Sequence, residues 1–399
     1  MKTTIHKAFK YRLYPTAKQE RQLAGHFGQA RFVYNYFLRQ RIDFFLAHKD
    51  EEKRGLNYHD TTAMLTELKK YPDYKWLNES NSQSLQQSLR HLDIAYTNFF
   101  KKGNGFPQFH KKNNRQSVTI PQYFSFNERV GNLKIPKMTS IKIVFHRPIC
   151  GIPKHVTVSM EPSGKYYASF LCEVTLDIPT KTTGGKIGID LGLKTFVVTS
   201  NGEMIDKPAH LHESEHKLKK LQHSLSRKNK DGENRRKARI KVAKLHEKIH
   251  NQRTDFLHKT SRRLIDENQV IYAESLNVKG MVKNHCLAKS VFDAGWGEFV
   301  RQLAYKSEWN GIKFEQIDRF FPSSKRCNAC GWINESLTLK DREWECHCCG
   351  SVIQRDLNAA QNILQFGQAS EIRRDAPKSK RLKKSRVVNR VAESGNCLL

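Results

Sequence analysis

The sequence predicts an α/β protein of several domains, and three observations support this fold class. The chain has 399 residues, more than one domain usually holds. Apolar residues recur at helical spacing through residues 16–103, whereas short β-like runs separated by Gly, Pro and Ser fill residues 104–181. Strand-like and helical segments alternate after that, and one short stretch holds five of the nine cysteines.

In the first half, residues 1–14 read as a strand that alternates apolar and basic residues and ends at Pro15. Thr16, with Gln19 three positions later, is a capping-box signal and predicts the start of a helix. A second helix is expected to end near Gly103, after a cationic last turn. The first strand is predicted to join the later β segments, so the helical block would be an insertion in an antiparallel barrel or sheet.

In the second half, a dense strand at residues 186–192 is followed by a return strand at Thr195–Thr199. A very basic region at 211–265 predicts two helices broken near Gly232. The remaining predicted elements are a strand at 269–274, a helix at 299–309, a strand at 312–317 and a helix at 357–364. The tail at 371–399 has nine Lys/Arg and three Asp/Glu, a net charge of 9 − 3 = +6, and is predicted to be disordered.

The net charge of the whole chain points to a polyanionic partner. There are 70 Lys and Arg against 39 Asp and Glu, which gives a formal charge of +31. The basic residues run through nearly every segment, and no stretch of about 18 apolar residues could span a bilayer. We therefore expect a nucleic-acid partner and no membrane. The charged N-terminus is unlike a secretory signal, so we expect a cytoplasmic protein.

The clustered cysteines have the spacing of a zinc site. Cys327-x2-Cys330 and Cys346-x2-Cys349 are separated by fifteen residues, and two such knuckles can direct four thiolates at one ion. His347 and Cys348 leave the ligands of the second knuckle open, although Cys346 and Cys349 have the better spacing. Four protein ligands leave no position for chemistry, so the site is expected to be structural. It could still contact DNA, because several basic and aromatic residues surround it: Lys325, Arg326, Lys340, Arg342 and Trp344.

Three acids stand where carboxylates are unusual. Asp190 sits in an apolar strand, Glu274 closes another, and Asp356 precedes the last predicted helix. Each has an ordinary alternative, such as a strand-end acid paired with a local arginine, or a helix N-cap. Together, in a strongly basic protein, they have the composition of a two-metal site in which oxygen ligands hold Mg²⁺ or Mn²⁺.

These motifs, in this order, resemble the TnpB (OrfB) proteins of insertion sequences, which are related to type V CRISPR effectors. The resemblance covers nearly the whole chain apart from its tail and rests on six short segments: residues 11–16 (Tyr-Arg-Leu-Tyr-Pro-Thr), 105–109 (Gly-Phe-Pro-Gln-Phe), 187–192 (Ile-Gly-Ile-Asp-Leu-Gly), 272–276 (Tyr-Ala-Glu-Ser-Leu), 322–325 (Pro-Ser-Ser-Lys) and 355–360 (Arg-Asp-Leu-Asn-Ala-Ala). One departure is visible, because Gln354 stands where the family often has an acid.

The resemblance implies an RNA-guided DNA endonuclease that cleaves beside a short motif read by the protein. Asp190, Glu274 and Asp356 would be the catalytic residues and would bind two Mg²⁺ or Mn²⁺ ions, and Cys327, Cys330, Cys346 and Cys349 would bind Zn²⁺. The partners would be a guide RNA from the element's end and double-stranded target DNA, on the nucleoid of a prokaryotic cell, with a monomer favoured. The alternatives are a transposase or accessory transposition protein, and a non-catalytic regulator that binds nucleic acid.

The resemblance also implies a division into domains. Residues 1–15 and 104–181 would form a β-barrel wedge domain, and 16–103 a helical recognition domain. A ribonuclease H-like (RuvC) nuclease domain would span 182–325 and 351–370, with a zinc-ribbon insertion at 326–350 and a basic tail at 371–399.

Four aromatic residues of the helical block lie at helical spacing, so we expect them in the core rather than stacked on bases: Tyr34, Tyr36, Phe99 and Phe100.

Overall fold

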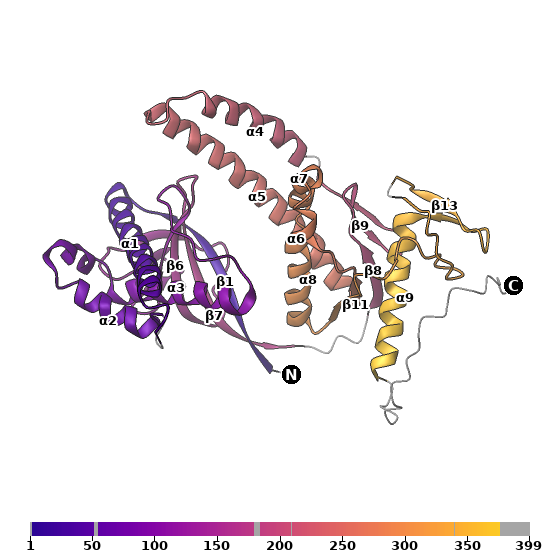
Figure 1. The fold of residues 1–399 in the computed structure, drawn as a ribbon, viewed down its shortest axis with the longest axis horizontal. Coiled ribbons are helices and arrows are strands. Elements are labelled where there is room, and N and C mark those ends of the chain that lie inside the picture. The colour runs from indigo at the N-terminus through magenta and orange to yellow at the C-terminus, as the bar shows by residue number, and fades with distance from the viewer. Residues whose placement is uncertain (1, 52–54, 179–183, 209, 339, 376–399) are drawn as a thin grey trace. The chain divides into compact units, whose positions relative to one another are not determined.

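The computed structural model describes residues 2–51, 55–178, 184–208, 210–338 and 340–375 (Figure 1). Contacts divide the chain into two compact units. The first comprises Lys2–Asp177 with Leu218–Glu247, and we call it the N-terminal unit; the second comprises Ile178–Lys217 with the residues from Lys248 onward, and we call it the C-terminal unit. Within the described ranges, no helix combines the length and the apolar character needed to cross a membrane.

The N-terminal unit is built on a seven-stranded sheet whose paired strands are all antiparallel. The strand order is β2-β6-β7-β1-β5-β4-β3. Within the described residues the two end strands, β2 and β3, are not paired with each other, so the strands form the antiparallel sheet that the sequence predicts as one of two possibilities. Its elements are β1 (Lys2–Tyr14), α1 (Ala17–Ala47), α2 (Tyr58–Leu68), the 3-10 helix η1 (Pro72–Glu79), α3 (Ser82–Lys102), β2 (Gln116–Ile120), β3 (Ser125–Asn127), β4 (Asn132–Lys134), β5 (Ile141–Val144), β6 (Ile152–Met160) and β7 (Tyr166–Asp177).

Two helix ends of this unit lie where the sequence predicts, the start of α1 and the end of α3. The Thr16 side chain accepts from the Gln19 backbone and the Gln19 side chain accepts from the Thr16 backbone, which is the capping box expected at the start of α1. Gly103 ends α3 with a left-handed backbone at φ 61°. Apolar side chains of α1, α2 and α3 form a separate core, among them Phe37, Leu65 and Leu89. The helical block is thus an insertion between β1 and β2 with its own packing.

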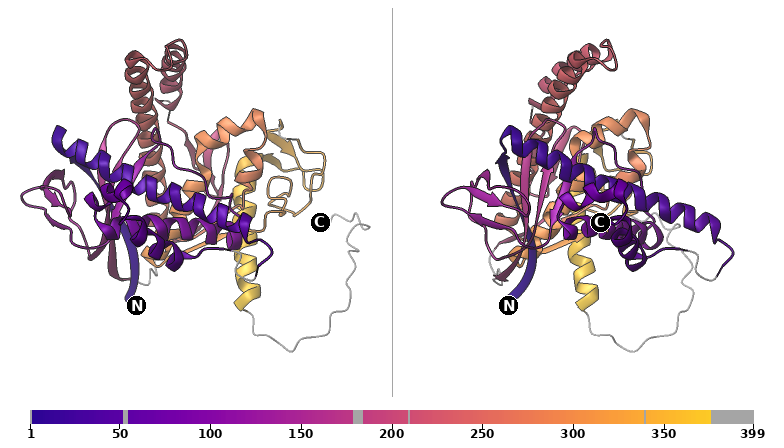
Figure 2. Two further views of the ribbon diagram at one scale, coloured as in Figure 1. Left: turned by 60° about the vertical axis from the view of Figure 1, so that its left-hand side comes forward. Right: turned by 90° about the vertical axis from the view of Figure 1, so that its left-hand side faces the viewer.

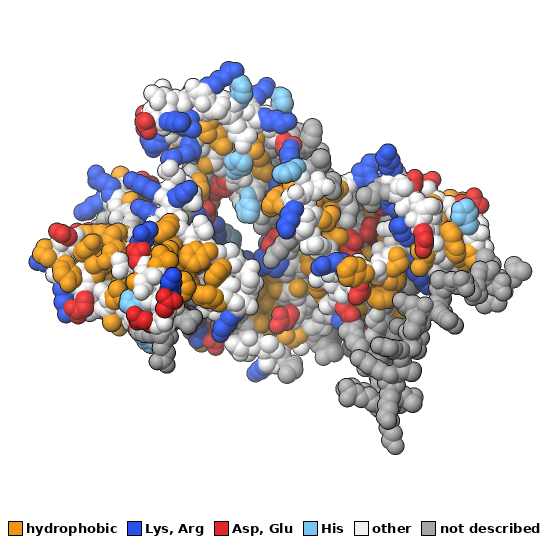
Figure 3. Space-filling view, viewed as in Figure 1, with side chains coloured by type: hydrophobic (Ala, Val, Ile, Leu, Met, Phe, Trp, Pro, Cys, Tyr) orange, Lys and Arg blue, Asp and Glu red, His pale blue; other side chains and the backbone are white. Residues whose placement is uncertain are grey.

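Two long helices follow the prediction for the basic region, but they divide between the units. α4 (His210–Ser226) and α5 (Glu233–Glu267) flank the predicted break and run side by side as a hairpin in both views of Figure 2. Residues 218–247 group with the N-terminal unit, although the sequence placed all of 182–325 in one nuclease domain. The Tyr167 hydroxyl donates to Glu247 at 2.7 Å and Lys165 pairs with the same carboxylate at 3.1 Å. Figure 3 shows Lys and Arg side chains gathered over this hairpin.

The C-terminal unit contains a five-stranded mixed sheet in the order β10-β9-β8-β11-β12. β8, β11 and β12 are parallel, whereas β9 returns antiparallel to β8. Buried side chains such as Ile189, Phe196 and Phe299 form its core. Besides α4 and α5, its elements are β8 (Gly185–Asp190), β9 (Thr195–Thr199), β10 (Met204–Asp206), β11 (Asn268–Ala273), α6 (Val278–Met281), α7 (His285–Ala294), α8 (Trp296–Asn310), β12 (Lys313–Gln316), β13 (Glu343–Glu345), β14 (Val352–Gln354) and α9 (Arg355–Asp375).

The last helix, α9, packs unusually close to the central strands of this sheet (Figure 1). A Cβ atom at Gly188 on β8 would lie 2.2 Å from the Ala360 carbonyl oxygen and 2.7 Å from the Leu364 nitrogen. A Cβ atom at Gly367 on α9 would lie 2.2 Å from the ring of Tyr272 on β11. Both distances are far inside van der Waals contact, so a glycine on the strand and a glycine on the helix set the separation of the two layers.

The structure corrects the predicted start of the disordered tail. α9 continues to Asp375, so residues 371–375 are helical, whereas residues 376–399 lie outside the described residues. Glu371 accepts from Lys313 Nζ at 2.7 Å, from the Tyr272 hydroxyl at 2.8 Å and from Lys186 Nζ at 3.1 Å. These partners come from β12, β11 and β8. This network could not be predicted from sequence patterns, because its members are separated by as many as 185 positions.

The glycine contact predicts the effect of a single added methyl group. Gly188→Ala should lower the free energy of unfolding of the C-terminal unit by about 3 kcal/mol, because the new Cβ meets backbone atoms that cannot rotate away. Urea unfolding would measure the loss. Gly297→Ala on α8 is the matched control, since its Cβ would have nothing within 4 Å and should leave stability unchanged or slightly raised. Equal midpoints for both variants would contradict the contact.

The Glu371 network predicts a pH-dependent contribution to stability. The hydrogen bonds from Lys313, Tyr272 and Lys186 lower the pKa of Glu371 to about 2, below its usual value of about 4.3. The contribution is therefore complete above about pH 4.3 and is lost as the pH falls toward 2. Glu371→Gln should destabilise the protein by about 1 kcal/mol at neutral pH. Its thermal midpoint should converge with that of the native chain near pH 2; a constant difference would exclude this origin.

Candidate functional site

Two of the predicted acids lie at adjacent strand ends in the C-terminal unit. Asp190 is the last residue of β8, and Glu274 directly follows β11. The two strands are parallel and Ile189 is in register with Ala273, so the next residues on each strand are neighbours. The Leu191 amide donates to Glu274 Oε1 at 3.3 Å, which ties the second carboxylate to the backbone beside the first.

The third acid arrives from α9. Asp356 is in the first turn of this helix, immediately after β14. The close approach of α9 to β8 carries it toward the ends of β8 and β11, and the charge of Asp356 acts on Asp190. Gln354, where the family often has an acid, accepts from the Leu357 amide at 2.5 Å and so caps the helix. Gln354 is therefore not an acid but still provides a side chain that caps α9.

The electrostatics of the three acids show that they form one group. Burial, then the negative charges of Glu274 and Asp356, raise the pKa of Asp190 well above its ordinary range, and Arg355 opposes the rise. Burial raises the pKa of Glu274 to about 7, opposed by the Leu191 amide. A cation would relieve the repulsion between such carboxylates, and carboxylate oxygens are ligands that divalent metals such as Mg²⁺ prefer.

Two arginines pair with Asp356. Arg355 donates to Asp356 Oδ1 from Nε at 3.0 Å and from Nη2 at 2.9 Å, and Arg342 donates to Oδ2 at 3.2 Å. The ordinary alternative of an acid paired with local arginines thus holds for Asp356. The charge of Asp356 still acts on the buried Asp190. The pairs with Arg355 and Arg342 are therefore compatible with Asp356 remaining close to the other two acids.

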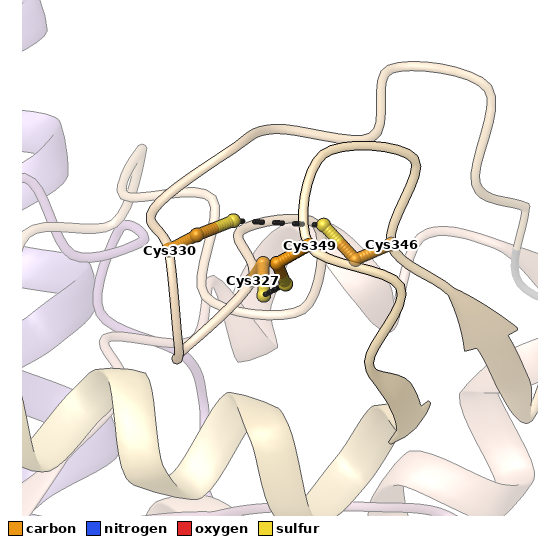
Figure 4. A group of neighbouring side chains, drawn as sticks. All are labelled: Cys327, Cys330, Cys346 and Cys349. Carbon is orange, nitrogen blue, oxygen red and sulfur yellow. Dashed lines mark hydrogen bonds between the residues drawn. The ribbon is translucent and has the colours of Figure 1, made fainter. Parts of the chain in front are cut away.

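The four predicted cysteines converge in a second site. The sulfur atoms of Cys327, Cys330, Cys346 and Cys349 all lie within 4.8 Å of one another, as Figure 4 shows. The Sγ atoms of Cys327 and Cys349 are 3.7 Å apart, and those of Cys330 and Cys346 are 3.6 Å apart. Zn–S bonds of about 2.3 Å in a tetrahedron place sulfurs about 3.8 Å apart. The arrangement therefore suggests a structural zinc ion.

Each cysteine pair lies on a tight turn. The Gly331 amide donates to the Cys327 carbonyl at 2.9 Å, and the Gly350 amide donates to the Cys346 carbonyl at 2.8 Å. Both glycines have left-handed backbones, with φ 84° and 69°, which lets the chain turn sharply behind each second thiol. Cys348 lies outside the group of four, which resolves the choice that the spacing left open in favour of Cys346 and Cys349.

Two buried asparagines of α9 fasten the cysteine segment to the helix that carries Asp356. Asn358 donates to the Arg326 carbonyl at 2.7 Å and accepts from the Asn328 amide at 2.9 Å. Asn362 donates to the Ser323 carbonyl at 2.9 Å. Asn358 belongs to the motif at residues 355–360, but the motif alone does not predict this role. A signal existed, because two asparagines four positions apart lie on one helix face and occupy positions expected to be apolar.

Family models match three parts of the chain. The model of insertion-sequence OrfB proteins, described as "Probable transposase", matches residues 169–285. A Cas12f1-like TNB domain matches residues 296–363, and an OrfB helix-turn-helix model matches residues 1–49. A candidate RNA-guided DNA endonuclease of Streptomyces pristinaespiralis is 41% identical over 375 residues, covering 93% of this chain and 91% of that protein. The chain belongs to the OrfB (TnpB) family.

Other relatives of the OrfB family cover the chain equally well. The candidate RNA-guided DNA endonuclease InsQ of Escherichia coli is 31% identical, over 91% of this chain and 92% of that protein. A TnpB-like protein of Acanthamoeba polyphaga mimivirus is 25% identical, over 90% of this chain and 72% of that protein.

Solved structures share the fold at low sequence identity. A Cas12f1–sgRNA–target DNA complex matches 90% of this chain and 98% of its own, with a TM-score of 0.53 and 13% identity. The mini RNA-guided endonuclease Cas-phi3 matches 91% of this chain and 92% of its own, with a TM-score of 0.50 and 9% identity. At these identities the likeness concerns the fold alone.

The helix-turn-helix description does not fit the structure of the segment it matches. Within residues 1–49, Lys2–Tyr14 form a strand and Ala17–Ala47 form one uninterrupted helix of 31 residues. A recognition helix needs a preceding helix and a short turn, and neither precedes α1 in the described residues. This OrfB protein therefore does not present that motif in its first 49 residues.

The cysteine geometry predicts which thiols hold zinc. Cys330→Ser should lose the stoichiometric zinc of the purified protein and lower the thermal midpoint, because three thiolates bind the ion far more weakly than four. Elemental mass spectrometry would measure the zinc content. Cys348→Ser is the matched control, since it removes a neighbouring thiol outside the group and should keep one zinc per chain. Zinc loss in both variants would contradict the ligand set.

Proposed function

We propose that this chain is an RNA-guided DNA endonuclease in which Asp190, Glu274 and Asp356 form a divalent-metal centre for phosphodiester hydrolysis. The observation that carries the proposal is the convergence of the three acids from β8, β11 and α9, with Asp190 and Glu274 raised in pKa by burial. The relatives whose names describe candidate RNA-guided DNA endonucleases support the substrate and the guide. The partners are a guide RNA and target DNA.

In this proposal, side chains and a backbone amide of the chain position the carboxylates that would bind the metal ions. Two Mg²⁺ or Mn²⁺ ions, when bound, supply Lewis acidity toward the attacking water and the leaving 3′ oxygen. Asp190 and Glu274 contribute buried carboxylate oxygens, and the Leu191 amide orients one of them. Arg355 and Arg342 hold Asp356 toward the other acids. Rigid strand ends and a helix start provide this geometry before the substrate binds.

The remaining parts take supporting roles. The parallel strands with α9 form the ribonuclease H-like (RuvC) domain, the four cysteines hold structural zinc, and the N-terminal sheet and helices form the wedge and recognition domains. Charge spread over α4 and α5 suits a guide–target heteroduplex, which proteins bind through its backbone and shape. Base pairing would then supply the sequence specificity.

A transposase remains a second candidate, because the matching OrfB model is described as "Probable transposase". A guide-dependent nuclease should co-purify with a defined RNA and cut DNA complementary to it. A transposase should instead join DNA ends without that RNA. Sequencing the co-purified RNA and supplying its complementary DNA separates the two, since strand transfer without a defined RNA would overturn the proposed function. A non-catalytic regulator is disfavoured, because all three acids are present.

Replacing one buried carboxylate should separate binding from cleavage. Asp190→Asn should reduce the rate of Mg²⁺-dependent cleavage by about 10³-fold or more, because a metal ligand is lost where charge develops. RNA and DNA binding should remain close to that of the native protein. Gel assays of cleavage and of complex formation measure the two effects. Asp255→Asn is the control, since it changes an exposed acid paired with Lys259 and should cut normally. Unchanged cleavage by Asp190→Asn would sink the assignment.

A further inference from the structure

The N-terminal unit holds a stacked pair of rings that the metal centre does not use. Tyr34 on α1 and His110, in the loop after α3, stack with ring centroids 3.9 Å apart and an interplanar angle of 8°. Tyr34 is buried whereas His110 is exposed. Both rings border a cavity of about 400 Å³. One face of the His110 ring is therefore supported by Tyr34, while the residue still reaches solvent at a cavity of small-ligand size.

The backbone holds His110 in place. The Asn35 side chain accepts from the His110 amide at 2.8 Å and donates to the His110 carbonyl at 3.0 Å. Further back in the loop, the Phe106 ring packs against Tyr96 and Phe99 on α3. A ring fixed in this way offers a rigid platform, so little conformational entropy is lost when a planar group stacks on it.

Cations surround the platform. Arg31, Lys111 and Arg115 line the cavity, and none of its lining residues, all of them described, is Asp or Glu. Arg31 donates to the Gln116 side chain, and Arg115 pairs with Glu161 at 3.3 Å. Lys111 is exposed and forms no ion pair within the described part of the chain. Burial, then the charges of His91 and Arg31, lower the pKa of His110, which favours the neutral form of its ring.

An aromatic platform bordered by cations is the combination that binds single-stranded nucleic acid. A base stacks on the ring face, which every base can do, and the cations attract the adjoining phosphates. We propose that His110 stacks on one unpaired base of a nucleic-acid strand and that Lys111 and Arg115 bind the adjoining phosphates. The proposal deepens the proposed function and rests on it for the identity of the strand, which is either guide RNA or target DNA.

Tyr34 has a structural part in this subsite. Tyr34 is 5% exposed, so it is the core residue that its helical spacing predicted, whereas the same prediction is wrong for Phe100, which is 74% exposed. The Tyr34 ring also backs the His110 ring. The described residues contain a similar pair in the same unit, because His48 stacks on Phe44 at 4.0 Å and 10°. Lys49, Asp50 and Glu51 follow that pair in the sequence, so it provides a matched control without an excess of cations beside it.

Fluorescence of a base analogue tests the stacking directly. The full chain is titrated with short single-stranded RNA and with DNA of the same sequence, each carrying one 2-aminopurine whose emission is quenched on stacking. His110→Ala should weaken binding about fivefold or more and remove most of the quenching. His110→Phe should keep both, since it retains a ring. Lys111→Gln should leave the quenching and lower the slope of log affinity against log salt by about 0.7.

The control and the two oligonucleotides decide the result. His48→Ala should bind and quench like the native chain. If His110→Ala matches His48→Ala, or if His110→Phe loses as much as His110→Ala, the stacking proposal is overturned. A larger effect with RNA assigns the subsite to the guide, and a larger effect with DNA assigns it to the target. The assay needs no cleavage, so a protein that shows these effects but cuts no DNA would overturn the endonuclease proposal alone.

Discussion

The contact of α9 with β8 and β11 is the constraint on which the C-terminal unit depends. Gly188 and Gly367 remove the side chains that would hold the helix away from the sheet. With the layers this close, the first turn of α9 brings Asp356 toward the strand ends that carry Asp190 and Glu274. The next turns place Asn358 and Asn362 against the segment that leads into the cysteines. One packing distance therefore sets both the acidic centre and the attachment of the zinc segment.

The charge balance of the acidic centre follows from the same geometry. Three carboxylates gathered in a partly buried site repel one another, and in a protein of net charge +31 they can be compensated from nearby. Arg355 and Arg342 compensate one of them through direct hydrogen bonds. Burial, the largest cause, raises the pKa values of the remaining two, Asp190 and Glu274, and a cation would stabilise their charged forms. The arginines thus neutralise the charge of Asp356, and the proposed metal ions would neutralise the charges of Asp190 and Glu274.

What the sequence could predict was local, and what it missed was contact between distant segments. The capping box at Thr16, the end of the helix at Gly103 and the strand that carries Asp190 depend on residues a few positions apart, and all were found. The Arg342 pair with Asp356 and the three partners of Glu371 depend on the folded arrangement. The tail was predicted to begin at residue 371 because the last turns of α9 carry charges that look solvated until their partners are known.

The N-terminal segment also bears on how the protein meets nucleic acid. Because α1 is one continuous helix, the unit lacks the paired helices that would place a recognition helix in the major groove through its first 49 residues. Contacts that tolerate any sequence must then carry much of the binding, through spread charge and stacking, with specificity supplied by base pairing. The His110 platform is a contact of that kind, since a ring face accepts every base. Its rigid support from Tyr34 and Asn35 suits a strand whose sequence changes with each guide.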